Sequence, residues 1–461
     1  MTTLGPDAAR LGSSLRGTFG GDVLLPGSPG YDDARRIFNG AIDRHPGAIA
    51  QCTTPDDVAL ALEAARDAEL EVSVRGGGHG VSGTALTDGG LTVDLRRMND
   101  VTVDADARTV RVGGGATIGD MDNAAAPYGL ATTGGRASTT GIGGFTLGGG
   151  SGWLERRFGL ASDNLLAVDM VTADGTALQA SADSHPELFW ALHGGGGNFG
   201  VATAFTFRLH ELPSFSVALL MWPAEYGPDV LRTYRDFCDT APDAVGGGFF
   251  YLVGPPEEFV PEHLVGRLVA AALVTYAGPE AECRDVAGPF LGLAPEGAMI
   301  AELPYPAFQC MLDDPPGMRN YWSSEYLTSF PDEAVDAFCA RAPEMVMPSP
   351  SLHVVFPQGG ALGRDNGRFP LPWRESPFAV HPFGMWEDPA DDARGVQWAH
   401  DVCADMRPWA TGSVYLNFIG DEGHTRVVDG FGPDNYRKLA GIKAEYDPDN
   451  VFHLNHNIRP A

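Results

Sequence analysis

The chain is poor in basic residues. Its 461 residues include 31 Lys and Arg against 60 Asp and Glu, which gives a formal net charge of −29. A surface this acidic repels nucleic acid and anionic membranes, so we expect neither as a partner. A bound phosphate group would have to be held by backbone N–H groups or by a few local cations.

Paired cysteines and long apolar runs are also missing. The six cysteines are far apart and form no C-x-x-C pair, which predicts reduced, mostly buried thiols and no metal site. No segment reaches the roughly 18 uninterrupted apolar residues of a membrane span. Met1 to Arg16 has no apolar core of signal-peptide length. We therefore expect a cytoplasmic protein.

Glycine, in contrast, is abundant and clustered, with 60 residues in the chain. Three glycine tracts stand out, at Arg75–Gly80, Gly141–Gly152 and Gly194–Gly200. Glycine costs backbone entropy on folding, so such runs are expected where the backbone closely approaches a ligand or needs positive φ. Successive N–H groups in a glycine loop can form an anion-binding nest, commonly for a pyrophosphate.

The third glycine tract contains a misleading motif. Gly195, Gly197 and Gly200 match the G-x-G-x-x-G pattern of dinucleotide-binding proteins. That fingerprint requires a strand before it and a helix after it. Here a predicted helix (Pro186 to Leu192) precedes and a predicted strand (Val201 to Leu209) follows, so we reject a Rossmann site.

The local patterns predict mixed α and β structure. Thr54 and Asp57 form a capping box for a helix that begins at Pro55. A second helix is expected from Ile118 to Tyr128. Strands are expected at 71–74, 91–95, 101–103, 109–112, 166–172 and 176–179, with hairpins at 101–112 and 166–179.

The composition changes near Leu212 and Pro213, where proline, aromatic residues and longer loops become more frequent. Strand-like runs follow at 217–221, 248–253, 265–276 and 352–356. We predict an α+β chain with three segments: 1–212, a second domain with an antiparallel sheet at 213–410, and a compact tail at 411–461.

His79 lies inside the first glycine tract, where it has few neighbours in sequence to pack against. A neutral imidazole nitrogen is a good nucleophile, and the C8α methyl group of an oxidised flavin is a credible electrophile. The alternative is a structural or solvated histidine. The residues alone do not decide between a histidine that bonds a flavin and a structural or solvated one.

Several motifs together resemble one family. They are Val74–Gly80, Gly141–Gly144, Leu147–Trp153, Gly159–Leu165, Phe189–Leu192 with Gly194–Val201, Tyr415–Phe418 and Tyr446–Phe452. In this order and spacing they resemble the berberine-bridge-enzyme-like FAD-linked oxidases of bacterial type, within the vanillyl-alcohol-oxidase superfamily. The resemblance covers nearly the whole chain.

The resemblance implies a two-domain PCMH-type FAD-binding fold, in which 1–212 and 411–461 form the FAD domain and the inserted domain roofs the flavin. It implies FAD bonded through His79. The residues implied to contact FAD are Arg75, Gly76, Gly77, Gly78, His79, Gly80, Gly135, Ser138, Thr140, Gly141, Gly143, Gly144, Leu147, Gly150, Gly152, Trp153, Asp163, Asn164, Leu165, Gly200, Val201, Tyr415, Asn417 and Asn455.

The chain departs from the family pattern at several positions. Some members form a second flavin bond through a cysteine in Gly-Arg-Cys, but Ala137 stands here, so we expect a single bond. Arg364 occupies the position of a catalytic glutamate found in plant members. His193 stands where arginine is frequent. Ile142 occupies the position that controls oxygen access in the family, and a bulky residue there can slow oxygen.

The resemblance implies hydride transfer from a substrate carbon to the flavin, with a base that removes a proton. Tyr415 is the main candidate base, although it can also merely pack against the ring. A free tyrosine has a pKa of about 10, so a phenolate needs stabilising neighbours. Tyr321, Glu325 and, as a binder of acidic or phenolic substrates, Arg319 are weaker candidates.

We expect an oxidase that acts on an alcohol, a sugar or a natural-product intermediate and is reoxidised by O₂. The alternatives are a dehydrogenase with another electron acceptor, a tailoring oxygenase, and a flavin carrier without turnover. Aromatic residues that can line the substrate pocket or pack in the core are Trp322, Phe356, Trp373, Phe383 and Trp386. Neither the substrate nor the oligomeric state follows from the sequence.

Overall fold

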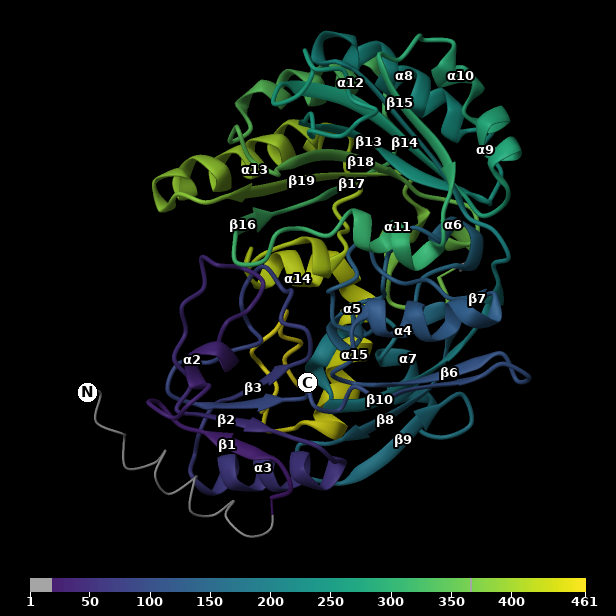
Figure 1. Ribbon diagram of the computed structural model, residues 1–461. Helices are drawn as coiled ribbons and strands as arrows, with labels where there is room; N and C mark the ends of the chain where they lie inside the picture. Colours follow the sequence, from purple (N-terminus) through teal and green to yellow (C-terminus); the bar gives the residue numbers. More distant parts are fainter. Residues whose placement is uncertain (1–18, 365–366) are drawn as a thin grey trace.

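The computed structural model describes residues 19–364 and 367–461 (Figure 1). The expectation for Met1 to Arg16 lies outside these residues. Strands and helices alternate irregularly along the chain, in an α+β arrangement. A large sheet with its helices occupies the upper half of Figure 1, and smaller sheets occupy the lower half.

The first part of the chain forms three sheets. A four-stranded sheet has the order β1-β2-β4-β3, and only its β1–β2 pair is antiparallel. A five-stranded antiparallel sheet has the order β5-β6-β10-β8-β9, and β11 pairs with β7. The strands are β1 (Asp22–Leu24), β2 (Ala48–Gln51), β3 (Val72–Arg75), β4 (Leu91–Asp94), β5 (Val101–Asp104), β6 (Thr109–Gly113), β7 (Leu130–Ala131), β8 (Leu165–Val171), β9 (Ala177–Ser181), β10 (Val201–Arg208) and β11 (His210–Glu211).

The middle of the chain forms one antiparallel sheet with the order β15-β12-β14-β13-β18-β19-β16, and β17 pairs with β19. Its strands are β12 (Ser216–Pro223), β13 (Val245–Val253), β14 (Leu268–Tyr276), β15 (Gly297–Glu302), β16 (Arg319–Trp322), β17 (Glu325–Leu327), β18 (Leu352–Pro357) and β19 (Phe378–Trp386). No strand of the described residues pairs across 212, although the exact domain boundaries stay predictions.

Helices cover one face of this large sheet (Figure 1). They are α8 (Gly227–Cys238), α9 (Glu280–Val286), α10 (Gly288–Leu291), α12 (Asp332–Ala340) and α13 (Asp392–Met406). Because side chains alternate across a strand, Phe249 and Val355 pack under the helices while their neighbours Phe250 and Phe356 point to the other face. That other face looks down on the first part of the chain.

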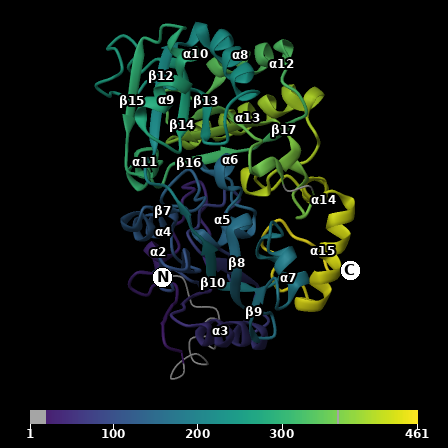
Figure 2. The ribbon, with the colours of Figure 1, turned by 90° about the vertical axis from the view of Figure 1, so that its right-hand side faces the viewer.

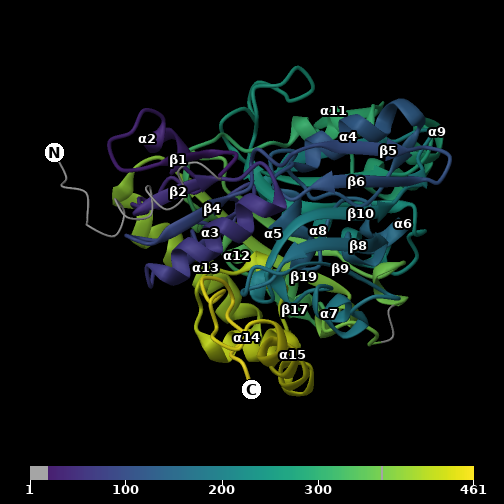
Figure 3. The same ribbon diagram turned by 90° about the horizontal axis from the view of Figure 1, so that it is seen from below.

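The remaining helices surround the smaller sheets. They are α2 (Tyr31–Ala34), α3 (Pro55–Asp67), α4 (Ile118–Ala125), α5 (Ile142–Leu147), α6 (Glu155–Phe158), α7 (Pro186–Ala191), α11 (Tyr305–Met311), α14 (His424–Phe431) and α15 (Pro433–Tyr446). In Figures 2 and 3 the yellow C-terminal helices lie against the lower half of the molecule, with α15 beside α7. The C-terminal tail therefore returns to the part built by the N-terminal residues.

Many local predictions are confirmed. Thr54 accepts the N–H of Asp57 in a complete capping box for α3, and both expected hairpins, β5–β6 and β8–β9, are present. Helix α7 precedes the third glycine tract and β10 follows it, which confirms the rejection of a Rossmann site. Strands β15, β16, β17 and β19 were not predicted, nor was helix α5 inside the second glycine tract.

Candidate active site: a cavity under the large sheet

One cavity of about 640 Å³ lies between the glycine tracts and the free face of the large sheet. This volume falls within the range typical of ligand pockets. All three glycine tracts contribute to its wall, and so does the C-terminal tail. Of the residues expected to contact FAD, those on the wall are Gly76, Gly77, Gly78, His79, Gly80, Gly135, Thr140, Gly141, Gly143, Gly144, Leu147, Trp153, Gly200, Tyr415, Asn417 and Asn455.

The first glycine tract begins where β3 ends and carries His79 on the cavity wall. The His79 Nε2 lies 3.0 Å from the Thr139 hydroxyl, and its Nδ1 lies 3.5 Å from the Thr140 hydroxyl. Removal from bulk water lowers the pKa of His79 to about 4. The imidazole is therefore neutral at physiological pH and keeps a nitrogen lone pair.

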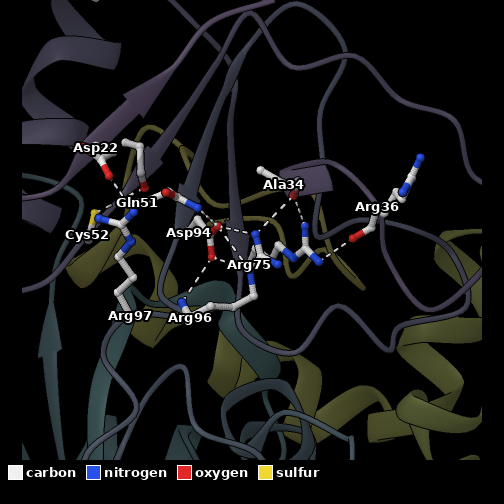
Figure 4. Close-up of polar contacts among 10 residues, drawn as sticks. Asp22, Ala34, Arg36, Gln51, Cys52, Arg75, Asp94, Arg96 and Arg97 are labelled. Atoms are coloured by element: carbon white, nitrogen blue, oxygen red, sulfur yellow. Dashed lines mark hydrogen bonds and ion pairs between the residues drawn. The ribbon is translucent and has the colours of Figure 1, made fainter. Parts of the chain in front are cut away.

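Arg75 fixes the segment that leads to Phe38, although Arg75 does not line the cavity. Its guanidinium group donates to the backbone carbonyls of Ala34 and Arg36, and Arg96 also donates to the carbonyl of Ala34 at 3.2 Å (Figure 4). Two residues after Arg36, the Phe38 ring stacks on His79. Arg75 thus positions the loop that covers the histidine.

The shape and donors of the cavity fit a dinucleotide such as FAD. Among the described residues, the backbone N–H groups of 77–80 donate to no protein acceptor. A Cβ atom added to Gly80, Gly144 or Gly197 would meet no heavy atom within 4 Å, so the backbone is bare toward open space at these positions. Trp153 and Asn455 line the wall, and the Trp153 Nε1 and the Asn455 Oδ1 are buried without a partner among the described residues. The unpaired backbone and indole N–H groups are donors of the kind that an anionic ligand requires, and the amide oxygen of Asn455 is an acceptor for a polar one.

Tyr415 is buried, and its phenolic oxygen lies among hydrogen-bond donors. The backbone N–H groups of Gly150 and Ser151 donate to it over 3.1 and 3.3 Å, and the Asn417 Nδ2 donates over 2.9 Å. Burial raises the pKa of Tyr415, while these bonds and the nearby Arg136 charge oppose that rise. The donors are the stabilising neighbours that a phenolate needs.

Arg136 lines the cavity beside Tyr415 and belongs to a buried polar network. Its guanidinium group donates to the Ser151 hydroxyl at 3.0 Å and to Glu155 at 2.9 Å. The same group lies 4.0 Å above the centre of the Phe356 ring. Arg136 therefore connects the second glycine tract to the free face of the large sheet.

Eight of the expected contact residues lie outside the cavity wall. Asp163 forms a two-bond ion pair with Arg374, and Asn164 donates to the carbonyls of Phe158 and Leu160. Ser138 donates to Asp313 from both its N–H and its hydroxyl group. The remaining ones are Arg75, described above, the tightly packed glycines Gly150 and Gly152, and the core residues Leu165 and Val201.

The weaker catalytic candidates are held elsewhere. Tyr321 contacts the His400 Nε2 at 2.8 Å, Arg319 pairs with Asp392, and Glu325 pairs with Arg426 at 3.1 Å. None of the three lines the cavity. Arg364 also lies outside the wall and pairs with Asp243. His193 donates through its Nδ1 to the carbonyl of Phe189 and stacks on Phe369, which accounts for its burial.

Of the aromatic residues considered for a substrate pocket, Trp322, Phe356 and Phe383 line the cavity, whereas Trp373 and Trp386 are core residues. Sequence reasoning missed Phe38 and His381, both on the wall. Phe38 has no motif around it. His381 sits on β19, whose alternation was not recognised because Pro382 and Gly384 interrupt the pattern.

Within 19–364 and 367–461 no helix is long and apolar enough to cross a membrane. The same residues contain no group of three or more His, Cys, Asp or Glu side chains that could hold a metal ion.

Comparison with known proteins matches two segments of the chain that both contribute to the cavity wall. The family model "FAD binding domain" matches residues 46–181, and "Berberine and berberine like" matches 414–459. The chain is 31% identical over 455 residues to (R)-6-hydroxynicotine oxidase of Paenarthrobacter nicotinovorans, covering 95% of this chain and 97% of that protein.

Solved structures of related proteins match nearly the whole chain as well. The crystal structure of 6-hydroxy-D-nicotine oxidase from Arthrobacter nicotinovorans matches with a TM-score of 0.85 and 28% identity, covering 96% of this chain and 99% of that one. Physcomitrella patens BBE-like 1 shares the fold, with a TM-score of 0.86 and 22% identity over 99% of both chains. The chain belongs to the berberine-bridge-enzyme-like FAD-linked oxidoreductases, with the PCMH-type FAD-binding fold.

Proposed function

We propose that this oxidoreductase is an oxidase that holds FAD through a single covalent bond to His79. The observation that carries this proposal is a neutral imidazole on the wall of a cavity whose glycine backbone is bare toward the ligand space. Bound FAD supplies the two-electron acceptor, which takes a hydride from a substrate C–H bond and passes the electrons to O₂.

The surroundings of His79 support covalent attachment. Two threonine hydroxyls and the Phe38 ring fix the imidazole, and one of its ring nitrogens stays unprotonated because the pKa is low. Attachment would join the imidazole nitrogen to the C8α methyl carbon, and the hydrogens of one methyl C–H bond and of the imidazole N–H would leave with two electrons to O₂ as hydrogen peroxide. Ala137 offers no thiol, which supports a single bond.

Acid precipitation tests the bond directly. The purified protein is precipitated with acid, and visible spectra of pellet and supernatant are recorded. We expect yellow pellet for the wild type and for the exposed-histidine control His45→Ala, and yellow supernatant for His79→Ala. A wild-type flavin found only in the supernatant would refute the covalent bond, and no flavin in either fraction would refute the whole proposal.

We propose Tyr415 as the base that removes a hydroxyl or amine proton during hydride transfer. Three N–H donors to its oxygen favour the ionised form, against the effect of burial. The donors remain in place whichever form the phenol takes, because two belong to the backbone.

We propose O₂ as the electron acceptor. The Ile142 side chain is fully buried in the core and does not line the cavity, so it does not narrow the cavity itself. The test is peroxide formation compared with dye reduction under the same substrate. Dye reduction without peroxide would establish a dehydrogenase, and neither reaction across a panel of alcohols, amines and sugars would establish a flavin carrier.

The remaining parts of the proposal concern partners and location. We propose a small-molecule substrate, no nucleic-acid or membrane partner, and a cytoplasmic location. The net charge of −29 supports the absence of a nucleic-acid or membrane partner. Retention of the purified protein on heparin or on anionic vesicles at about 0.15 M salt would contradict that absence.

A further inference from the structure

We propose that His381 determines specificity by accepting a hydrogen bond from a hydroxyl or N–H donor on an otherwise apolar, ring-shaped substrate. The inference rests on the proposed function, because it places the substrate in the same cavity. It goes further by naming the chemical class of that substrate and the residue that selects it.

The free face of the large sheet is almost entirely apolar where it lines the cavity. Twelve sheet residues contribute: Leu219, Phe250, Leu252, Val253, Ala271, Leu273, Trp322, Leu352, Val354, Phe356, His381 and Phe383. Only Trp322 and His381 carry a hydrogen-bonding side chain. Since the Trp322 Nε1 already donates to the carbonyl of Asn417 at 3.2 Å, His381 is the one free polar group on this face of the described sheet.

The tautomer of His381 follows from its partner. Its Nδ1 lies 2.9 Å from the backbone carbonyl of Ser323, and a carbonyl only accepts, so Nδ1 carries the proton. In the neutral ring, Nε2 on the opposite edge then has a lone pair. Nε2 has no hydrogen-bond partner among the described residues, and the ring lines the cavity.

Burial keeps this imidazole neutral, because it lowers the pKa of His381 to about 3. A neutral acceptor binds a ligand that has an O–H or N–H hydrogen-bond donor. It forms no hydrogen bond with an ether oxygen, and its lone pair repels a carboxylate. The group therefore distinguishes a phenol or an alcohol from the corresponding ether.

Aromatic rings surround His381 and favour a flat ligand. The Phe418 ring stacks on it with centroids 4.1 Å apart, and Phe383 and Trp322 lie at 5.8 and 6.4 Å. Aromatic surfaces suit a ring-shaped apolar molecule. A polyhydroxylated sugar would leave most of its hydroxyl groups unpaired against this face, so the loss of their bonds to water would not be compensated.

The test measures ligand binding to the FAD-loaded protein, and the change in flavin absorbance reports the binding. The probes are 2-naphthol and 2-methoxynaphthalene, which share the ring system and differ in the donor. We expect 2-naphthol to bind about 5- to 10-fold more tightly, as for one net hydrogen bond. In His381→Phe, which preserves the stack on Phe418, we expect the two constants to agree within about twofold.

Two further variants complete the design. His193→Phe is the matched control, because His193 has the same Nδ1-to-carbonyl bond and a stacked ring at 3.9 Å but lies outside the cavity wall. It should keep the wild-type preference. His381→Gln supplies an amide oxygen as acceptor and should recover part of the preference, and it serves as the second variant where His381→Phe fails to fold.

Four results would overturn the proposal: no saturable binding of 2-naphthol, equal wild-type constants for both probes, an unchanged preference in His381→Phe, or tighter binding of cellobiose than of 2-naphthol. Binding requires neither turnover nor a covalent flavin. A preference for the donor-bearing probe without peroxide formation would therefore refute the oxidase proposal and support the role of His381. Peroxide formation without this preference would support the oxidase proposal and refute the role of His381.

Discussion

The ring of Phe38 lies on the ring of His79, with centroids 4.1 Å apart and planes inclined by 16°. The two residues come from different segments, and the N–H of Phe38 donates to the carbonyl of Gly78. Arg75 holds the Phe38 segment through the carbonyls of Ala34 and Arg36. The orientation of the histidine therefore depends on a loop far from it in sequence.

Phe38→Ala should reduce covalent flavin attachment without abolishing FAD binding. Without the stacked ring, His79 gains rotamer freedom and spends less time in a reactive orientation. We expect less than about half of the flavin to be acid-stable, measured as pellet absorbance relative to total flavin. Phe158→Ala is the control, since Phe158 stacks on His210 at 4.4 Å outside the cavity. Equal acid-stable fractions in both variants would contradict the prediction.

Tyr415→Phe should lower kcat by about 10²- to 10⁴-fold, the range for loss of a general base. Tyr326→Phe, at a buried tyrosine outside the cavity wall, is the control and should retain near-wild-type kcat. An equal loss in both variants would point to packing and not to proton transfer.

Asn417→Ala should shift the rising limb of the pH profile of kcat to higher pH. In the proposed mechanism the phenolate of Tyr415 is the active form, so we expect the rate to rise with pH through the pKa of Tyr415. Asn417 donates to the phenolic oxygen and so lowers that pKa. Its removal should raise the pKa and shift the rising limb of the kcat profile to higher pH. If the rising limb does not shift at equal flavin content, a group other than Tyr415 causes the pH dependence.

Asp163→Asn should destabilise the protein while leaving its flavin content unchanged. Asp163 accepts two bonds from the buried Arg374, each 2.7 Å long, and so links the glycine-rich part to the inserted domain. We expect a loss of about 2–3 kcal/mol in the free energy of unfolding, measured by urea titration. A normal unfolding curve combined with reduced FAD binding would instead support a cofactor contact.

Lys443→Met should destabilise the C-terminal tail by about 3–5 kcal/mol, because it leaves Asp447 buried without its cation. The Lys443 Nζ donates to Asp447 and to the carbonyls of Asn198 and Phe452, and the ion pair is fully buried. Urea titration measures the loss. The double variant with Asp447→Asn should recover part of it, and a double variant no more stable than the single one would show that the charge is not the cause.

The local part of the fold was predictable where the signal lies in adjacent residues. Thr54 with Asp57 fixes the start of α3, and Ala173-Asp174-Gly175 fixes the β8–β9 turn. Strand β19 was missed because His381, Pro382 and Gly384 dilute its β-forming pattern, although it is the centre of three strand pairings. Helix α5 was missed because glycine has low helix propensity, and tertiary packing overrides that preference.

The site was predictable where glycine and motif order mark the backbone. Most of the cavity-lining glycines were found in this way, whereas Phe38 and His381 reach the cavity only through long-range packing. Asp163, Asn164 and Leu165 belong to the same motif as Gly159, but Asp163 and Asn164 bond to the backbone of Leu160 and Leu165 packs in the core. A motif therefore identifies a local backbone shape more surely than a ligand contact.

The return of the C-terminal tail to the glycine tracts has a consequence for biosynthesis. Tyr415, Asn417 and Asn455 complete a cavity whose wall also contains the N-terminal residues Phe38 and His79. The ribosome must therefore synthesise both the inserted domain and the tail before the cofactor chamber closes. Flavin that meets the nascent chain would find only part of this wall, so we expect stable FAD binding only after the whole chain has been synthesised and has folded.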